Sequence, residues 1–372
     1  MKYYIIAGEA SGDLHGSNLI KALKQEDPQA NVRCWGGDLM QAQGGTVVKH
    51  IRDLAFMGFI EVVANLGTIL KNISFCKKDI SDFQPDVIIL IDYPGFNFRI
   101  AEWAKKQGIP THYYISPQLW AWKEGRIKKV KNFVDAMYVI LPFEKDFYEK
   151  KHNYPVHFVG HPLLDAIADR EPVYPEQFRE EHNLDERPII ALLPGSRKQE
   201  ITTMLDVMLE MVPQYPEHQF VIAGAPSQEI DFYNGIINGR DAHIIQNKTY
   251  DLLSVADAAL VTSGTATLET ALFKIPQVVC YKGSWISYQI AKRLIKLDYI
   301  SLVNLILDRT VVTELIQGEF NTKRLKKELD HILDPYQRSV LFLDYYDLEQ
   351  ALGGTGASAN TAKLIFNAIK KN

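Results

Sequence analysis

The sequence predicts an α/β protein made of two Rossmann-like domains that face one cleft. Short apolar runs alternate with amphipathic helical stretches along the chain, which is typical of parallel sheets flanked by helices. The alternation breaks once, into a polar stretch around residues 165–188 that has the composition of a linker. The 372 residues are also enough for two domains of ordinary size, each with its own core.

The expected strands are the short apolar runs, and they fall into two series separated by the polar stretch. They cover residues 3–7, 86–92, 112–115 and 136–141, and then residues 189–193, 219–223, 258–262 and 277–280. A glycine-rich turn at 353–356 precedes a last helix over 357–371. We therefore expect an N-terminal domain over residues 1–166, a C-terminal domain over 167–350 and a final helical segment over 351–372.

Composition excludes several classes of protein. The hydrophobic content of 47% and the charged content of 23% are ordinary for a globular protein. A formal net charge of −4 argues against a nucleic-acid partner that binds over the whole surface. Cys34, Cys76 and Cys280 lie far apart and read as reduced, buried residues. No run approaches about 18 apolar residues and no secretion leader is visible, so we expect a cytoplasmic location.

The first expected strand runs into an acidic glycine turn, with the sequence AGEASGD at residues 7–13. Gly8, Gly12 and Gly16 recur every fourth residue, which differs from the G-x-G-x-x-G dinucleotide motif, and no G-K-[ST] follows. Glu9 stands where a phosphate-binding loop would present only backbone amides. The turn is therefore suited to hold a carboxylate beside a substrate, and it points away from NAD and ATP.

A second carboxylate, Asp92, ends the buried apolar run at residues 88–91. An acid at the carboxyl end of a central strand faces the ligand crevice of such a fold, although an aspartate there can also cap the next turn. If Glu9 ends an adjacent strand, the two carboxylates face one cleft. One of them would then serve as a general base and the other would orient a hydroxyl group.

The sequence indicates neither a metal site nor a cofactor. It contains no D-x-D triplet, which is the usual Mg²⁺ or Mn²⁺ ligand of metal-dependent sugar-nucleotide enzymes. His152, His157 and His161 lie close together but lack the spacing of zinc ligands and acidic partners.

In the second half, Arg197 ends the string LLPGSR at residues 192–197. A guanidinium group at a strand end can bind a diphosphate through two parallel hydrogen bonds. The alternative is a surface arginine that caps a turn, and the residues alone do not decide between the two.

The string VTSGTATLE at residues 261–269 ends a strand and begins a helix, whose free amides and positive dipole end suit a phosphate. The residues at this helix start are Ser263, Gly264, Thr265 and Ala266. Glu269 follows one turn later, and Ala266 three residues before it cannot complete a capping box. We therefore favour a role in which Glu269 binds ribose hydroxyls.

Two segments have the composition of a membrane-contact surface. Residues 54–63 are almost continuously apolar and include Phe56, Met57 and Phe59. The segment is either a core helix or an apolar face that contacts a membrane or acyl chains. The other segment follows Trp120 and Trp122 and is a basic run made of Lys123, Arg126, Lys128, Lys129 and Lys131. It is either a solvated helix face or a contact for anionic lipid headgroups.

Seven strings together resemble the lipid-A-disaccharide synthase family, and they occur in the family's order. They are AGEASGD at 7–13, SPQLWAW at 116–122, LPFE at 141–144, GH at 160–161, LPGSR at 193–197, SGTA at 263–266 and DYISLVNL at 298–305. The resemblance implies an inverting glycosyltransferase with the two-domain B-type fold. It would transfer 2,3-diacylglucosamine from UDP to the 6-hydroxyl of 2,3-diacylglucosamine 1-phosphate (lipid X).

The resemblance also implies a role for each domain. The N-terminal domain would bind the acceptor through the turn that includes Ser11, and it would supply the base, with Asp92 preferred over Glu9. The C-terminal domain would bind the UDP-sugar without a metal, and Asn304 would contact the donor or order the cleft. The last helix would pack back on the first domain or exchange in a homodimer. Because both substrates carry acyl chains, the enzyme would be peripherally associated with the inner membrane.

The chain departs from the family pattern at Gly95, where the family often has an acid in the string D-x-P-D-F-N. This departure bears on acceptor binding rather than on the base. Two other function classes stay open at this point. One is a different UDP-sugar enzyme of the same fold, such as a UDP-N-acetylglucosamine 2-epimerase or a peptidoglycan-type transferase. The other is a non-catalytic protein that binds sugar nucleotides or lipids.

Overall fold

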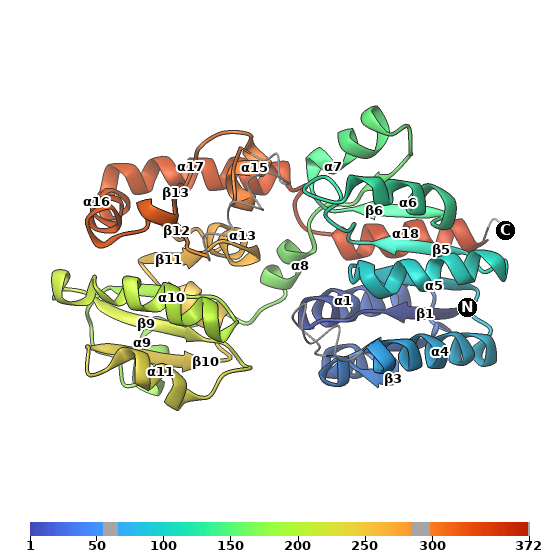
Figure 1. The fold of residues 1–372 in the computed structure, drawn as a ribbon, viewed down its shortest axis with the longest axis horizontal. Coiled ribbons are helices and arrows are strands. Elements are labelled where there is room, and N and C mark those ends of the chain that lie inside the picture. Colours follow the sequence, from blue (N-terminus) through green and yellow to red (C-terminus); the bar gives the residue numbers. More distant parts are fainter. Residues whose placement is uncertain (55–65, 284–297, 371–372) are drawn as a thin grey trace. The chain divides into compact units, whose positions relative to one another are not determined.

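A computed structural model describes residues 1–54, 66–283 and 298–370 (Figure 1). The chain divides into two compact units. The first unit combines Met1–Arg170 with Leu352–Asn372, and the second consists of Glu171–Ala351. Each unit is a parallel sheet covered by helices, so the predicted α/β class with two Rossmann-like domains is confirmed.

The sheet of the first unit has seven strands among the described residues, in the order β3-β2-β1-β4-β5-β6-β7. All neighbouring strands are parallel. The central strands β1 and β4 are almost entirely apolar and buried, as expected for strands covered on both faces. The strands are β1 Lys2–Ile6, β2 Asn31–Gly36, β3 Thr46–His50, β4 Val87–Ile91, β5 Thr111–Tyr114, β6 Ala136–Val139 and β7 His157–Phe158.

The helices of this unit begin where the sequence supplies start signals. Proline occupies the first helical position of α5, α7 and α8, where a missing amide hydrogen costs nothing. The helices are α1 Ala10–Glu26, α2 Asp38–Ala42, α4 Leu66–Phe83, α5 Pro94–Lys106, α6 Ile127–Phe133, α7 Pro142–Asp146, α8 Pro162–Ala168 and α18 Ala357–Lys370. Short 3-10 helices at Ile51–Leu54 and Glu124–Arg126 and a π-helical turn at Phe147–Lys151 complete the described elements.

The sheet of the second unit has six parallel strands in the described part of the chain, in the order β10-β9-β8-β11-β12-β13. They are β8 Ile189–Leu193, β9 Gln219–Gly224, β10 Ala242–Gln246, β11 Ala258–Thr262, β12 Gln277–Tyr281 and β13 Thr313–Ile316. The helices are α9 Pro175–Glu181, α10 Lys198–Leu209, α11 Ile230–Ile237, α12 Thr249–Val255, α13 Thr265–Leu272, α15 Leu302–Leu307, α16 Thr322–Leu333 and α17 Pro335–Ala351. A short 3-10 helix lies at Val212–Gln214 and another at Gln317–Glu319.

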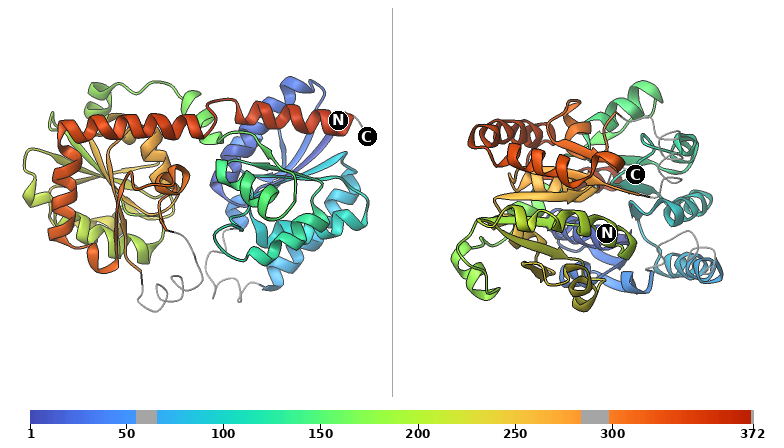
Figure 2. Two further views of the ribbon diagram at one scale, coloured as in Figure 1. Left: turned by 90° about the horizontal axis from the view of Figure 1, so that it is seen from above. Right: turned by 60° about the vertical axis from the view of Figure 1, so that its left-hand side comes forward.

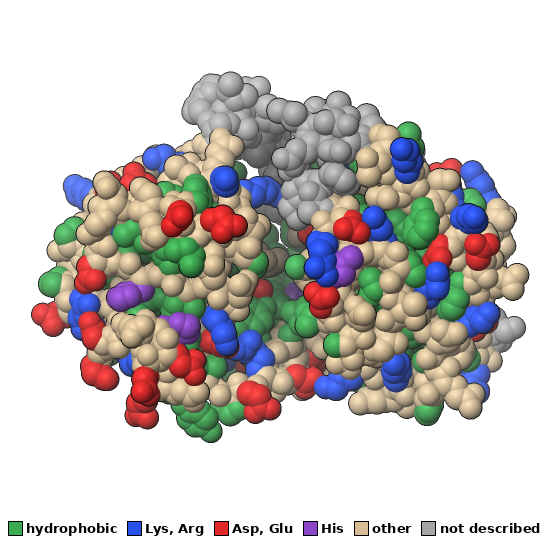
Figure 3. Space-filling view, turned by 90° about the horizontal axis from the view of Figure 1, so that it is seen from below, with side chains coloured by type: hydrophobic (Ala, Val, Ile, Leu, Met, Phe, Trp, Pro, Cys, Tyr) green, Lys and Arg blue, Asp and Glu red, His purple; other side chains and the backbone are tan. Residues whose placement is uncertain are grey.

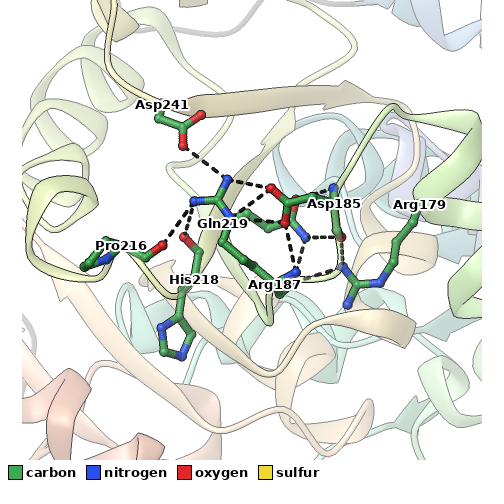
Figure 4. A network of polar contacts seen from close by, with 7 residues as sticks. All are labelled: Arg179, Asp185, Arg187, Pro216, His218, Gln219 and Asp241. Atoms are coloured by element: carbon green, nitrogen blue, oxygen red, sulfur yellow. Dashed lines mark hydrogen bonds and ion pairs between the residues drawn. The ribbon is translucent and has the colours of Figure 1, made fainter.

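The amino edge of the second sheet is held together by Arg187, which lies at the centre of the network in Figure 4. Its guanidinium contacts Asp185 at 2.7 Å and Asp241 at 3.2 Å. It also donates hydrogen bonds to the carbonyl oxygens of Pro216 at 3.2 Å and His218 at 3.3 Å. These contacts join the segments that lead into β8, β9 and β10.

On the face that Figure 3 shows, basic and acidic side chains are interspersed and form no large patch of a single charge. Among the described residues, no helix is both long and apolar enough to cross a membrane.

The last helix, α18, belongs to the first unit and packs along α1 (Figures 1 and 2). Asp165 on α8 holds its start, because its carboxylate accepts hydrogen bonds from the amides of Gly356 at 2.5 Å and Ser358 at 2.8 Å. Nearby, the amide of His161 donates to the carbonyl of Leu352 at 3.0 Å. Gly160 has φ +92° and lies against this returning segment. The string GH at 160–161 therefore marks where the chain's end rejoins its beginning.

Replacing Asp165 with alanine leaves two amides at the start of α18 without their carboxylate acceptor. We expect a loss of about 1–3 kcal/mol of stability and faster hydrogen exchange of the α18 amides. Asp169→Ala is the matched control, because Asp169 forms only an exposed ion pair with Lys21 and its removal should cost less than about 0.5 kcal/mol. Equal hydrogen-exchange rates in the two variants would contradict this role of Asp165.

Candidate active site

Four of the predicted features lie where the strand order of a sheet reverses: Glu9, Asp92, Arg197 and the segment 263–269. In folds of this kind, ligands bind beyond the carboxyl ends of the strands at this switch point. In the first unit the order reverses between β1 and β4, and these strands lead into Glu9 and Asp92. In the second unit it reverses between β8 and β11, which lead into Arg197 and the segment 263–269.

Glu9 and Asp92 form an electrostatically coupled pair of carboxylates. Desolvation by the surrounding protein, together with the negative charge of Glu9, raises the pKa of the Asp92 carboxyl to about 6, and the Tyr93 amide partly offsets this by bonding the charged form. Asp92 is nevertheless exposed to solvent, as Glu9 is. Glu9 itself is exposed at the N-cap position of α1, and in the described structure its side chain makes no capping hydrogen bond. The pair can therefore present one basic carboxylate and one anionic neighbour to a ligand.

The backbone at Asp92 adopts a conformation that non-glycine residues avoid. Asp92 has φ +40° and Tyr93 has φ +48°, so two consecutive residues are left-handed. Such a conformation costs roughly 1–2 kcal/mol per residue, and it tends to persist where function requires it. The bend sends the chain from the end of β4 directly into α5, and it brings the Asp92 side chain to the end of the sheet.

Gly8 makes this bend possible because the Tyr93 ring lies directly on its backbone. A Cβ atom at Gly8 would overlap Cγ of Tyr93, closer than real contacts allow. The Tyr93 ring also stacks on Phe96, with ring centroids 5.5 Å apart. The first glycine of the AGEASGD turn therefore serves close packing of the chain that carries Asp92.

The other polar residues of this turn have different roles. Asp13 is buried, and its carboxylate accepts hydrogen bonds from the amides of Gly37 at 2.6 Å, Leu39 at 3.1 Å and Met40 at 3.1 Å. It thus holds the start of α2 and is a structural residue. Ser11 is exposed in the first turn of α1, two residues from Glu9.

The side chains of Trp120 and Trp122 lie in different environments. The Trp120 ring packs edge-on against Phe143, with centroids 4.8 Å apart, whereas Trp122 is 51% exposed beneath the Lys123 ammonium group. Of the basic run, Lys123, Lys128, Lys129 and Lys131 are exposed and Arg126 is half-buried. The apolar residues Phe56, Met57 and Phe59 lie outside the described residues.

Glu144, in the string LPFE, is a buried acid whose role the sequence alone does not indicate. Its carboxylate accepts hydrogen bonds from the amides of Ile140 at 3.1 Å and Leu141 at 2.9 Å, and burial raises its pKa to about 7. Ser116 is hydrogen-bonded to Tyr148 at 2.7 Å beside it. Ile115, which precedes the SPQLWAW string, has φ +62° although it is β-branched. These contacts fix the loop after β5.

In the second unit, Arg197 is exposed at the N-cap position of α10. Glu200 in the first turn of this helix accepts a hydrogen bond from the amide of Ser196 at 3.2 Å and lies against Gly195, which has φ +101°. The start of α10 therefore already holds a carboxylate of its own. This leaves the Arg197 side chain, rather than the helix start, as the group that can bind an anion there.

The start of α13 presents backbone amides at the place where the sequence predicts an anion site. Gly264 and Thr265 are exposed, and the amides of Thr265 and Ala266 have no acceptor within the helix because they belong to its first turn. The Ser263 hydroxyl is used differently, since it donates to the carbonyl of Ile300 at 3.0 Å. The backbone rather than the serine side chain is thus presented at this helix start.

Glu269 is half-buried one turn into α13 and accepts a hydrogen bond from the Tyr250 hydroxyl at 2.8 Å. Burial raises the pKa of its carboxyl above the usual value, and the Tyr250 hydrogen bond partly offsets this. A carboxylate held in this way keeps a free lone pair for a second hydroxyl donor.

Asn304 is fully buried, and its side chain holds the loop between residues 298 and 314. Its Oδ1 accepts hydrogen bonds from the amides of Val311 and Val312, and its Nδ2 donates to the carbonyl of Val312 and to Glu314, all at 2.8–2.9 Å. Glu314, which sequence reasoning missed, also accepts from the amides of Ile300 and Ser301. A lone acid near the start of β13 gives no motif by which it could have been found.

A metal centre is not evident in the described ranges, which contain no cluster of three or more histidine, cysteine, aspartate or glutamate side chains able to hold an ion.

Comparison with known proteins places these features in a family. The family model described as lipid-A-disaccharide synthetase matches residues 3–351. The chain is 41% identical to the lipid-A-disaccharide synthase of Syntrophus aciditrophicus, over 99% of this chain and 98% of that protein. It is 39% identical to that of Geobacter metallireducens, over 99% and 97%. This chain belongs to the lipid-A-disaccharide synthase family.

Solved structures support the same fold at a greater distance. The UDP-GlcNAc 2-epimerase of Neisseria meningitidis, solved with UDP-GlcNAc bound, has a TM-score of 0.66 and 15% identity and is matched over the full length of both chains. The glycosyltransferase of kitacinnamycin has a TM-score of 0.64 and 12% identity, with 99% of each chain covered. At these identities the likeness shows the fold, whereas the synthase family membership rests on the sequence relatives.

Replacing Gly8 with alanine should displace the Tyr93 ring and destabilise the protein by about 1–3 kcal/mol, because the new methyl group overlaps the ring. Gly95→Ala is the matched control. Gly95 lies in α5 with open space within 4 Å of where a Cβ would stand, so alanine there should stabilise the protein by about 0.4–1 kcal/mol. Urea unfolding measures both changes, and a neutral Gly8→Ala variant would contradict the packing argument.

Proposed function

We propose that this chain is a lipid-A-disaccharide synthase. The reaction transfers 2,3-diacylglucosamine from UDP-2,3-diacylglucosamine to the 6-hydroxyl of 2,3-diacylglucosamine 1-phosphate. The products are the β-1,6-linked lipid A disaccharide 1-phosphate and UDP. The family match over almost the whole chain supports this reaction. The proton transfer is supported by one observation, which is the pair of coupled carboxylates, Glu9 and Asp92, at the switch point of the first sheet.

Inversion at the sugar carbon requires direct attack by the acceptor oxygen. The 6-oxygen forms a bond to C1 of the donor sugar while the bond from C1 to the UDP oxygen breaks. The hydroxyl proton passes to the Asp92 carboxylate, which acts as general base. A base with a pKa of about 6 is mostly deprotonated near neutral pH, yet it is a stronger acceptor than an ordinary aspartate. Glu9 orients the hydroxyl and keeps the pKa of Asp92 high.

The leaving UDP is bound by the second unit in this proposal. The free amides at the start of α13, at Thr265 and Ala266, and the Arg197 guanidinium would stabilise the diphosphate electrostatically without a metal. Glu269, held by Tyr250, would accept hydrogen bonds from the ribose. Asn304 and Ser263 act through the loop that they hold in place.

Both substrates carry acyl chains, so the proposal also needs residues that contact the lipid acceptor or the membrane. Ser11, Trp120 and Trp122 lie on the unit that carries the base, and Phe56, Met57 and Phe59 belong to the apolar segment of the same half of the sequence. We include in the proposal that these residues contact lipid X or the inner-membrane surface, with the enzyme peripheral on its cytoplasmic side. The exposed Trp122–Lys123 pair supports such a contact. A homodimer in which α18 exchanges between subunits completes the proposal.

Incubation with UDP-2,3-diacylglucosamine and lipid X should yield the disaccharide 1-phosphate and UDP, with and without EDTA. Asp92→Asn should lower kcat by about 10²–10⁴-fold, because the general base is lost. Asp86→Asn is the control, since Asp86 precedes β4 at the opposite end of the strand and binds the amide of Lys2. Mass spectrometry detects the product.

Three results would contradict the proposal. They are the absence of disaccharide with the wild-type protein, an Asp92→Asn variant as active as wild type, and activity that EDTA abolishes. Conversion of UDP-N-acetylglucosamine to its 2-epimer would instead identify an epimerase of the same fold.

Glu9→Gln should shift the acid limb of the pH profile of kcat/KM to lower pH. The negative charge of Glu9 raises the pKa of Asp92, so its removal lowers that pKa and leaves the base deprotonated at more acidic pH. Wild type should lose activity below about pH 6, and the variant should lose it at lower pH. Glu26→Gln, at the exposed far end of α1, is the control. A limb that stays in place or moves upward would contradict the coupling.

A further inference from the structure

The carbonyl oxygen of Asp92 accepts hydrogen bonds from two buried side chains. The Tyr113 hydroxyl donates to it at 2.5 Å and Nδ2 of Asn97 donates to it at 2.7 Å. Both residues are 0% exposed, and they come from different elements, β5 and α5. Two side-chain donors on one backbone oxygen are unusual, because most buried carbonyl groups are paired within secondary structure.

The left-handed bend explains why this oxygen needs side-chain donors. The Asp92 amide still donates to the carbonyl of Tyr114 at 3.3 Å and thus continues the pairing of β4 with β5. The chain then bends at Asp92 and Tyr93, so the next carbonyl can no longer follow the ladder. Asn97 also donates to the carbonyl of Ile91 at 3.2 Å, so one amide group joins the last residue of β4 to the bend.

The bend is held from its other side as well. The Tyr93 ring lies on Gly8 and stacks on Phe96, which blocks rotation of the chain in that direction. The backbone that carries Asp92 is thus fixed between the two side-chain donors and the AGEASGD turn. Only the side-chain torsions of Asp92 stay free, and they place its carboxylate beside Glu9.

We propose that Tyr113 and Asn97 are positioning residues for Asp92, which aim its carboxylate at the acceptor hydroxyl without touching either substrate. This inference rests on the function proposed above, in which Asp92 takes the proton. Loss of either donor lets the peptide after Asp92 rotate and moves the carboxylate. Displacement by about 1 Å is enough to lower the rate of a reaction roughly a hundredfold, while substrate binding by other groups is unchanged.

The pKa of Asp92 depends on the titratable groups around it, so a displaced carboxylate should have a different pKa. Glu9 faces it from the turn before α1, Tyr93 follows it in the chain, and Tyr113 faces it from β5. Arg126 and Tyr148 act on Tyr113 in turn. A carboxylate that moves away from Glu9 loses the effect of that negative charge on its raised pKa. The acid limb of the activity profile then moves to lower pH.

The test is Tyr113→Phe, which removes only the hydroxyl. We expect kcat to fall between about ten- and a hundredfold, KM for the UDP-sugar to stay within about twofold, and the acid limb to shift below its wild-type position. Tyr138→Phe is the matched control, because Tyr138 is an equally buried tyrosine on the neighbouring strand β6 whose hydroxyl contacts His112 at 3.1 Å. It should keep the wild-type kcat and pH profile.

Asn97→Ser provides a second variant, since serine is too short to reach the Asp92 carbonyl, and the same changes in kcat and acid limb are expected. The proposal is wrong if Tyr113→Phe keeps the wild-type kcat, if it lowers kcat no more than Tyr138→Phe does, or if its acid limb does not move. The same assay includes wild-type protein and Asp92→Asn as references. A wild-type protein that forms no disaccharide, or an active Asp92→Asn variant, contradicts the proposed function instead.

Discussion

The contact between the Tyr93 ring and the bare backbone of Gly8 is the constraint on which the N-terminal site depends. It joins the ends of β1 and β4 at the point where the strand order reverses. Without a Cβ at Gly8 the ring can lie on the chain, and the two left-handed residues before α5 can form. The same contact brings Glu9 and Asp92 close enough for one charge to alter the pKa of the other.

Much of this arrangement was predictable from sequence because buried parallel strands leave a strong signal. The strands predicted at 3–7, 86–92 and 189–193 each have an uninterrupted apolar centre. In the structure the first begins and ends one residue earlier, the second is one residue shorter at each end, and the third has the predicted bounds. A polar residue directly after such a run must lie at the carboxyl edge of the sheet. This rule placed Glu9, Asp92, Arg197 and the segment 263–269 correctly at strand ends.

What escaped sequence reasoning depends on contacts between residues far apart in the chain. The edge strand β3 and its neighbour β2 carry charged or polar residues such as Lys49 and Arg33, which hide the period of a buried strand. Asp13 resembles a second active-site acid until its three amide partners, 24 to 27 residues later, are known. Glu314 and Tyr113 act on backbone groups, and no residue pattern records which carbonyl or amide a side chain reaches.

The return of α18 to the first unit has a consequence for biosynthesis. Asp165 is bonded to amides 191 and 193 residues further along the chain, and α1 is covered by a helix that begins at Ala357. On the ribosome the seven strands of the first sheet emerge long before the helix that covers α1, and the whole second unit is made in between. The unit that carries Asp92 is therefore completed after the second unit has been made, because contacts between distant residues form only when both partners exist. A nascent chain therefore contains Glu9 and Asp92 early, but it gains the helix that covers α1 only after the whole second unit has been synthesised.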